Sequence, residues 1–317
     1  MFGLKSDWVL EPKPRSFVKE DYDAGQAKWC PGCGDFAVLN AIQRLCRDQQ
    51  LLPENTCFVS GIGCSSRFPH YMKTYGFHGL HGRAFPVACG IRSRRPDLNL
   101  FVATGDGDCC SIGAGHWIHG LRYNMKMVVM LFDNNIYGLT KKQTSPTSPK
   151  GTFSNTHPDG SFMSPMNPIT VSLGITNTSF LAQTVDWNPP HLYATLKAAF
   201  EHDGTAFVRI MQRCPHFTPD NYTPYQNDPS KVLLMTHENG IQGGEAVEKT
   251  FKTQVVHDPT DRPGAFELAI NHDVLPIGLF YRNPNAERYD NYSSVGADMS
   301  PADKVEAIDT LMDHYVV

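Results

Sequence analysis

The sequence lacks the features that mark several large classes of protein. No apolar run approaches the roughly 20 residues that a membrane-spanning helix needs. There is no strongly basic tract and the net charge is −4, so nothing favours binding to nucleic acid. The N-terminal residues contain no apolar stretch of the signal-peptide kind, which makes a cytoplasmic location the expectation. No internal repeat or low-complexity tract is evident. The 317 residues are therefore compatible with one large α/β domain and an extension.

The strongest pattern that the sequence does contain lies between Thr104 and Thr140. One short apolar run precedes a Gly-Asp-Gly-Asp turn, and a second run, residues 127–132, precedes Asp-Asn-Asn. Bulky or β-branched runs that end at turn residues predict buried parallel strands, and the intervening residues are long enough for a crossover helix. Both strands would deliver their polar residues, Asp106 and Asn134, to one carboxyl edge of a sheet, where open α/β sheets bind ligands.

The residue types at this edge indicate a magnesium and phosphate site. Carboxylate and amide oxygens suit Mg²⁺, and Gly105 and Gly107 allow the backbone to approach a phosphate. An ordinary Asp-Gly turn and an Asx turn are the alternative. The occurrence of both halves on one strand–helix–strand unit favours the cofactor site. The Gly-Asp-Gly…Asn-Asn pattern resembles the signature of thiamine diphosphate enzymes, which implies that Asp106, Asn134 and the carbonyl of Ile136 hold Mg²⁺ against the diphosphate.

A Cys-x-x-Cys pair, Cys30 and Cys33, precedes a predicted helix for which Asp35 is the expected N-cap. Four interpretations compete. A thioredoxin-like redox pair expects a different neighbourhood, and a zinc ribbon needs a second closely spaced pair, which the sequence lacks. Two buried thiols would leave the proline and glycines of the motif unexplained. An iron–sulfur cluster needs four thiolates, and Cys64 and Cys214, each on a loop after a predicted strand, are candidates.

Five motifs taken together resemble the β subunit of the 2-oxoacid:ferredoxin oxidoreductases. They are Trp-Cys-Pro-Gly-Cys-Gly-Asp, Gly-Ile-Gly-Cys-Ser-Ser, His-Gly-Arg-Ala, Gly-Asp-Gly-Asp and Asn-Asn-Ile-Tyr-Gly. The resemblance implies one 4Fe–4S cluster held by Cys30, Cys33, Cys64 and Cys214. It also implies a thiamine diphosphate site lined by Ile62, Gly63, Cys64, Ser65, His81, Gly82, Arg83, Ala84, Gly107, Asp108, Gly138 and Leu139. The other five cysteines are expected to be packing thiols.

The alternation of strands and helices predicts an α/β fold, with an open, mostly parallel sheet and helices on both faces. The resemblance implies that this is the pyrophosphate-type domain of the thiamine diphosphate-binding fold. We expect an N-terminal arm over residues 1–28, a cofactor-binding domain over residues 29–230, and an extension over residues 231–317 that packs on the core or on a partner subunit. The long loop after Gly138 is expected to be functional.

The resemblance implies oxidative decarboxylation of a 2-oxoacid with coenzyme A as co-substrate, giving acyl-CoA, CO₂ and reduced ferredoxin, or the reverse. No glutamate lies in a motif that would activate thiamine, and in the family this residue comes from an α subunit. We therefore expect an αβ heterodimer or its dimer, with this chain inactive alone. No run of four clustered cysteines of the ferredoxin type is present, so an external ferredoxin is the expected electron carrier.

Two cations, Arg67 and Lys141, flank the thiamine segments and are candidates for binding a second carboxylate of the substrate. This favours 2-oxoglutarate over pyruvate. Alternatively, Arg67 pairs with the diphosphate and Lys141 is solvated. Two other classes of protein stay open: a non-redox thiamine enzyme would not need the four cysteines, and a zinc-stabilised binding protein would leave the Gly-Asp-Gly…Asn-Asn unit unused.

Overall fold

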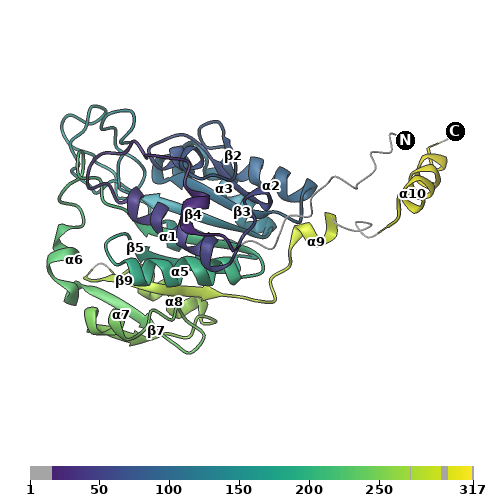
Figure 1. Cartoon of the computed structure of the whole chain (residues 1–317). Coiled ribbons are helices and arrows are strands. Elements are labelled where there is room, and N and C mark those ends of the chain that lie inside the picture. The colour runs from purple at the N-terminus through teal and green to yellow at the C-terminus, as the bar shows by residue number, and fades with distance from the viewer. Residues whose placement is uncertain (1–15, 272, 294–298, 316–317) are drawn as a thin grey trace.

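The computed structural model describes residues 16–271, 273–293 and 299–315. The described residues form a nine-stranded sheet in the order β2-β1-β3-β4-β6-β5-β9-β7-β8 (Figure 1). Neighbouring strands are parallel except for β5 and β9, which confirms the predicted open and mostly parallel sheet. The strands are β1 (Thr56–Ser60), β2 (Tyr75–His78), β3 (Asn99–Gly105), β4 (Met127–Asp133), β5 (Phe180–Val185), β6 (Thr205–Met211), β7 (Val232–Thr236), β8 (Gln254–Val256) and β9 (Leu275–Arg282).

The two predicted site strands are β3 and β4, and they are neighbours in the sheet. Gly105 lies opposite Phe132 in their parallel register, so the residues that follow each strand emerge at the same edge. The predicted crossover helix is α3 (Ala114–Tyr123), and a π-helical turn, Asp108–Ile112, precedes it. In this turn the N–H of Gly113 bonds to the carbonyl of Asp108, five residues earlier.

Helices cover both faces of the sheet (Figure 1). Alternate strand residues pack against opposite layers, as the pleat requires: Phe101 belongs to the core under α1 and α5, and Val102 to the core under α2, α3, α4 and α8. Both faces of these strands are therefore buried, which explains why their sequences are continuously apolar and do not alternate with polar residues. The helices are α1 (Asp35–Asp48), α2 (Ala84–Arg94), α3, α4 (Pro168–Leu173), α5 (Pro189–Glu201), α6 (Thr223–Asn227), α7 (Glu245–Thr250), α8 (Arg262–Ala269), α9 (Tyr289–Ser293) and α10 (Pro301–Asp313).

The predicted N-cap of α1 is wrong. Gly34 occupies the cap position, and Asp35 is the first helical residue, with a completely buried side chain. The reason is tertiary: the N–H of Gly34 bonds to the carbonyl of Arg213, which fixes the last residue before the helix against the loop after β6. Burial raises the pKa of the Asp35 carboxyl to about 7, because the charged form is desolvated there.

Residues after 230 continue the sheet. β9 pairs antiparallel with β5, and β7 and β8 extend the sheet beyond it. Val232, Leu234 and Ile277 pack in one apolar cluster with Val185 and Met211 of the preceding strands. The proposed boundary between residues 230 and 231 stays a prediction, as does the arm over residues 1–28, most of which lies outside the described residues.

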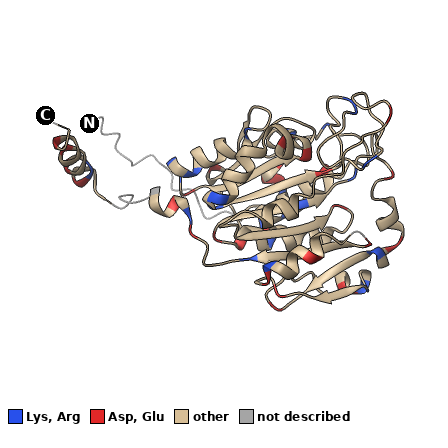
Figure 2. Ribbon diagram, turned by 180° about the vertical axis from the view of Figure 1, so that it is seen from behind, with Lys and Arg blue, Asp and Glu red and all other residues tan. Residues whose placement is uncertain are grey.

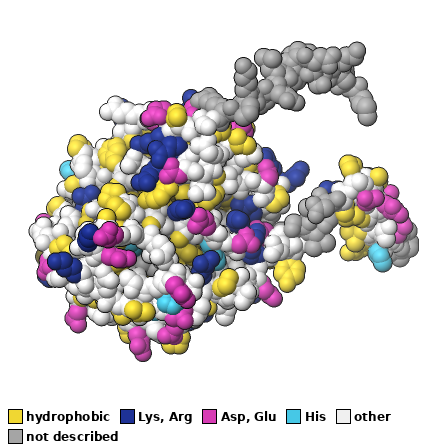
Figure 3. Space-filling model, turned by 60° about the horizontal axis from the view of Figure 1, so that its bottom comes forward, with side chains coloured by type: hydrophobic (Ala, Val, Ile, Leu, Met, Phe, Trp, Pro, Cys, Tyr) yellow, Lys and Arg dark blue, Asp and Glu magenta, His cyan; other side chains and the backbone are white. Residues whose placement is uncertain are grey.

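The surface carries both signs of charge. Figure 2 shows Lys and Arg interspersed with Asp and Glu along the chain. The amphipathic helix α10 has every residue exposed, and its apolar residues gather on one side (Figure 3). They include Val305, Ile308 and Met312. In the described part of the chain, no helix has the length and apolar character needed to cross a bilayer.

Candidate functional site

A cavity of about 140 Å³ lies where β1, β3 and β4 end. Loops that follow these strands supply most of its lining. Because the strands are parallel, segments that are far apart in sequence meet at the same edge of the sheet. The lining residues are Ile62, Gly63, Cys64, Ser65, His81, Gly105, Asp106, Gly107, Asp108, Asn134, Ile136, Tyr137, Gly138, Leu139 and Thr140. Most of the predicted thiamine segments therefore meet here. Gly82, Arg83 and Ala84 do not line the cavity, although Gly82 contacts the site through its backbone N–H.

The three predicted magnesium ligands line this cavity together. Asp106 is 2% exposed, and the amide oxygen of Asn134 accepts a hydrogen bond from the N–H of Ile136 at 3.2 Å, which holds that turn in place. Burial, and then the charge of Asp133, raise the pKa of the Asp106 carboxyl to about 7. Asp133 is compensated by Arg209 at 2.6 Å. No ion pair between described residues involves Asp106, so a divalent cation fits this carboxylate, amide and carbonyl set.

Two hydroxyls that the sequence reasoning missed orient Asp106. Ser145 Oγ and Thr147 Oγ1 lie 2.5 and 2.7 Å from its Oδ2, and Thr147 Oγ1 lies at the same 2.7 Å from Asp133 Oδ1. Both residues are buried on the long loop after Gly138, whose unusual length was the available signal. The long loop thus holds one carboxylate oxygen of Asp106, although Asp106 itself directly follows β3.

Asp108 joins three loops of the site through hydrogen bonds. Its Oδ1 accepts from the N–H of Ile62 at 3.0 Å, the N–H of Gly82 at 2.7 Å and Nδ1 of His81 at 2.7 Å. Its Oδ2 accepts from Thr104 Oγ1 at 2.6 Å. A Cβ at Gly61 would lie 2.0 Å from the same carboxylate, so only glycine fits there. The oxygens of Asp108 are saturated by this chain, and the residue shapes the cavity through the loops it joins.

We expect Asp108→Ala to lower the free energy of unfolding by about 3 kcal/mol or more, because four donors lose one buried acceptor group. Thiamine diphosphate affinity should fall at least tenfold, since the Ile62 and His81 loops lose their common attachment. Thermal unfolding of the purified complex and cofactor titration would measure both effects. Asp97→Ala is the matched control: this exposed carboxylate pairs with Arg95 at the surface, and we expect little change in stability. Equal stability of the two variants would contradict the role of Asp108.

The four predicted cluster cysteines converge beside the cavity. A Cβ at Gly138 would lie 3.5 Å from Cys64 Sγ and 4.0 Å from Cys214 Sγ, and the N–H of Cys33 bonds to the carbonyl of Cys30 at 3.0 Å. Cys33 interacts electrostatically with Cys64 and Cys214, and Cys64 with Cys30. All four thiols are free. Burial raises the pKa of Cys64 to about 12, so a metal would have to displace the proton from this thiol.

The four thiols come from three separate loops and supply the kind of ligand that an iron–sulfur cluster takes. Among the described residues, no three His, Cys, Asp or Glu side chains are grouped closely enough to hold one metal ion. A cubane cluster is wider than one ion and takes one thiolate at each iron, so its four ligands lie further apart. Four thiols from three separate loops therefore fit a 4Fe–4S cluster. Of the other five cysteines, Cys46, Cys57, Cys109 and Cys110 are buried and Cys89 is half-buried, as packing thiols would be.

The two candidate substrate cations lie outside the cavity lining. Arg67 donates to the carbonyl of Lys28 at 2.9 Å, and its guanidinium lies 5.6 Å from the ring centre of Tyr71. Lys141 is exposed and directly follows Thr140, which lines the cavity, and it adopts a left-handed backbone conformation with φ 68°. Lys141 is therefore the better placed of the two to reach a substrate that protrudes from the cavity.

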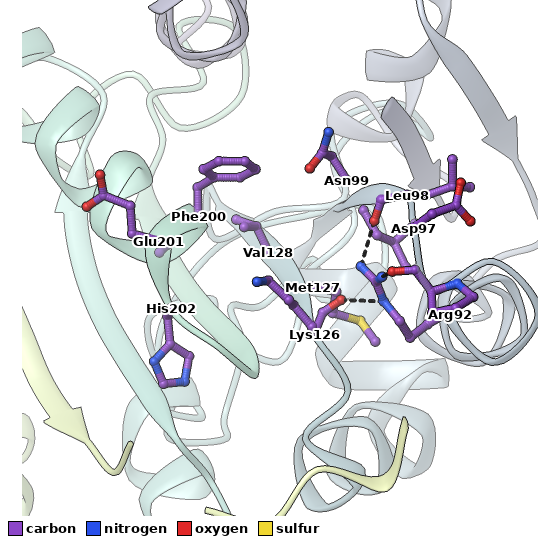
Figure 4. Close-up of a pocket in the computed structure, with 13 residues that line it drawn as sticks. Arg92, Asp97, Leu98, Asn99, Lys126, Met127, Val128, Phe200, Glu201 and His202 are labelled. Carbon is purple, nitrogen blue, oxygen red and sulfur yellow. Dashed lines mark hydrogen bonds between the residues drawn. The ribbon is translucent and has the colours of Figure 1, made fainter. Parts of the chain in front are cut away.

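A second cavity, of about 320 Å³, lies at the opposite edge of the sheet, near the starts of β3 and β4 (Figure 4). Its charged groups already have partners. The guanidinium of Arg92 donates to the carbonyls of Lys126, Pro96 and Leu98, and Lys126 Nζ lies 3.3 Å from Asp203. These contacts satisfy the groups that would attract a ligand. The site chemistry therefore concentrates at the carboxyl edge.

Comparisons with known proteins agree with this geometry. Residues 61–210 match the family described as thiamine pyrophosphate enzyme, C-terminal TPP binding domain. Residues 247–298 match the family that describes the C-terminal part of the pyruvate ferredoxin oxidoreductase beta subunit. The chain therefore combines a region similar to thiamine-binding domains with a segment similar to the C-terminal part of these beta subunits.

Individual relatives cover most of the chain. The 2-oxoglutarate oxidoreductase subunit KorB of Mycobacterium tuberculosis is 43% identical over 86% of this chain and 79% of its own length. The 2-oxoacid:ferredoxin oxidoreductase subunit beta of a Sulfolobus species is 36% identical over 83% and 84%. A solved 2-oxoglutarate:ferredoxin oxidoreductase from Magnetococcus marinus, with 2-oxoglutarate, coenzyme A and succinyl-CoA bound, has a TM-score of 0.79 at 35% identity. The match covers 94% of this chain and 97% of that one.

Proposed function

This chain belongs to the β subunits of the 2-oxoacid:ferredoxin oxidoreductases, and from that membership we propose that it acts with an α subunit on 2-oxoglutarate. The reaction is CoA-dependent oxidative decarboxylation to succinyl-CoA and CO₂, or the reverse reductive carboxylation, with ferredoxin as electron carrier. One observation carries the proposal: Cys64 lines the thiamine cavity and also belongs to the group of four thiols. A redox centre and a thiamine site thus share one loop.

The residues proposed to hold the cofactors follow from the site. Asp106, Asn134 and the carbonyl of Ile136 would bind Mg²⁺, and the four thiols would bind a 4Fe–4S cluster. The loops around Ile62 and Gly138 would line thiamine diphosphate, which supplies carbanion chemistry for decarboxylation while the cluster accepts single electrons. This chain's own part is to hold both groups at one sheet edge and to shield them from water.

A partner is required to complete the site. Among the described residues that line the cavity, Asp106 and Asp108 are the only ones with a carboxylate, and no glutamate is present. Asp106 is committed to the proposed cation, and Asp108 is saturated by four donors from this chain. The carboxylate that activates thiamine therefore has to come from the α subunit, and isolated β chain is expected to be inactive.

For the substrate, the names of the relatives and the position of Lys141 both favour 2-oxoglutarate over pyruvate. The relatives from Mycobacterium tuberculosis and Magnetococcus marinus are named for 2-oxoglutarate. Lys141, the exposed residue after cavity-lining Thr140, would provide a cation for a second carboxylate, which pyruvate lacks. Arg67 is a further candidate, although its contacts with Lys28 and Tyr71 restrain it.

We expect Lys141→Ala to lower kcat/KM for 2-oxoglutarate by about 10- to 100-fold, because a charged hydrogen bond contributes about 1.5–3 kcal/mol. Turnover of pyruvate should change little. Ferredoxin reduction by the complex, purified without oxygen and assayed for iron, sulfide and thiamine diphosphate, would measure this. Lys150→Ala removes another exposed lysine of the same loop and serves as the control. Faster turnover of pyruvate than of 2-oxoglutarate by the wild-type complex would overturn the substrate assignment.

A further inference from the structure

A buried amide lies against one of the four thiols. Gln212 is the residue that follows β6, and its side chain is 1% exposed. Its backbone N–H bonds to the carbonyl of Asp133 at 2.9 Å, which continues the pairing of β6 with β4 by one residue. Its Nε2 lies 3.3 Å from Cys33 Sγ and 2.5 Å from the carbonyl of Arg213. The amide is thus positioned by the sheet and not by a loose loop.

The two contacts determine which way this amide points. A backbone carbonyl is an acceptor only, and a metal-bound thiolate is also an acceptor. Exchanging Nε2 and Oε1 would place an oxygen against both, whereas the observed orientation gives each acceptor one N–H. Oε1 is buried and has no hydrogen-bond partner among the described residues, so the N–H donors of Gln212 are used while its acceptor is not.

We propose that Gln212 donates an N–H···S hydrogen bond to the Cys33 ligand of the iron–sulfur cluster and thereby raises the cluster's reduction potential. This inference rests on the cluster assigned under the proposed function. Reduction adds one electron to the cluster and makes its thiolate sulfurs more negative, so a hydrogen bond to such a sulfur stabilises the reduced form more than the oxidised form. Gln212 is a positioning residue here, because it acts through Cys33.

A purely structural role for the Gln212 side chain predicts a change in cluster content and stability and not in reduction potential. The bond from Gln212 to the Arg213 carbonyl lies next to Cys214, so loss of the side chain could alter the path of that loop and the amount of cluster bound. Such an effect would appear in iron content and stability. A hydrogen bond to sulfur alters the reduction potential of clusters that are fully assembled. Iron content therefore reports a structural role of Gln212, and the potential reports the hydrogen bond.

The test is Gln212→Leu in the αβ complex, purified without oxygen, with the fraction of reduced cluster followed by electron paramagnetic resonance at controlled potentials. We expect the ratio of reduced to oxidised cluster at a given potential to be about tenfold lower than in wild type, which for one electron corresponds to a shift of about 59 mV toward lower potential. Gln183→Leu is the control. This buried amide of the same sheet donates to the carbonyl of Pro276, and its loss should leave the potential unchanged.

Unchanged potential in a Gln212→Leu complex with full iron and sulfide content would overturn the inference and leave the proposed function intact. Wild-type complex that contains no iron or sulfide would instead overturn the proposed function. If the variant does not assemble a cluster, wild-type complex labelled with ¹⁵N at glutamine side-chain amides decides. Pulsed electron paramagnetic resonance should detect a ¹⁵N nucleus coupled to the reduced cluster, and absence of that coupling would refute the hydrogen bond.

Discussion

Asp106→Ala is expected to abolish retention of Mg²⁺ and thiamine diphosphate and to lower activity at least about 10³-fold. Asp106 is the only carboxylate in the proposed magnesium set, and Mg²⁺ depends on such an oxygen donor. Loss of about 4 kcal/mol of interaction corresponds to three powers of ten in rate. Because the side chain is buried and held by Ser145 and Thr147, no neighbouring carboxylate can take its place without rearranging that network.

Measurement of this effect needs the cofactor content as well as the rate. Magnesium and thiamine diphosphate would be determined in complex purified without oxygen and passed through a desalting column. Iron and sulfide should stay at the wild-type level, because Asp106 follows β3 on a loop that carries none of the four proposed cluster cysteines. Asp106→Asn keeps the shape and removes the charge, and we expect an intermediate loss. Wild-type cofactor affinity in Asp106→Ala would show that the cation site lies elsewhere.

The second large effect is expected from Cys64→Ala. This thiol lines the cavity and is one of the four proposed cluster ligands, so its removal would take one ligand from the cluster and open the cavity wall. A site with three thiolates is expected to lose most of its iron, and ferredoxin reduction should fall at least about 10³-fold, since the cluster is the proposed centre for single-electron transfer. Mg²⁺ binding should persist, because Asp106 and Asn134 lie on other loops.

Iron, sulfide and ferredoxin reduction in the purified complex would report this loss. Cys89→Ala removes a half-buried thiol on α2, away from the cavity lining, and is expected to retain both iron and activity within about twofold. The comparison separates a ligand from a packing thiol of the same chemistry. Full iron content in Cys64→Ala would remove Cys64 from the ligand set and with it the link between the two centres.

The amino-acid sequence alone was sufficient for the central unit of the fold. The apolar runs before Gly105 and Asp133 form β3 and β4, the residues between them include α3, and Asp106 and Asn134 meet at one edge. This was predictable because strand burial and the parallel crossover are set by local patterns within about 40 residues of chain. Cys64 and Cys214 could be named as candidates because each follows a predicted strand, whereas the assignment of all four cysteines to one cluster came from the resemblance of the motifs to a family.

The tertiary structure decided how the site is held. Ser145 contacts Asp106 across 39 residues of chain, and Gln212 contacts Cys33 across 179. No local pattern encodes such pairs, because they depend on where loops from different strands cross. The same reason explains the wrong cap at Asp35, since the bond from Gly34 to Arg213 also joins distant segments. Periodicity and spacing therefore fix which strands end at the site, and packing between distant loops fixes the orientation of each side chain in it.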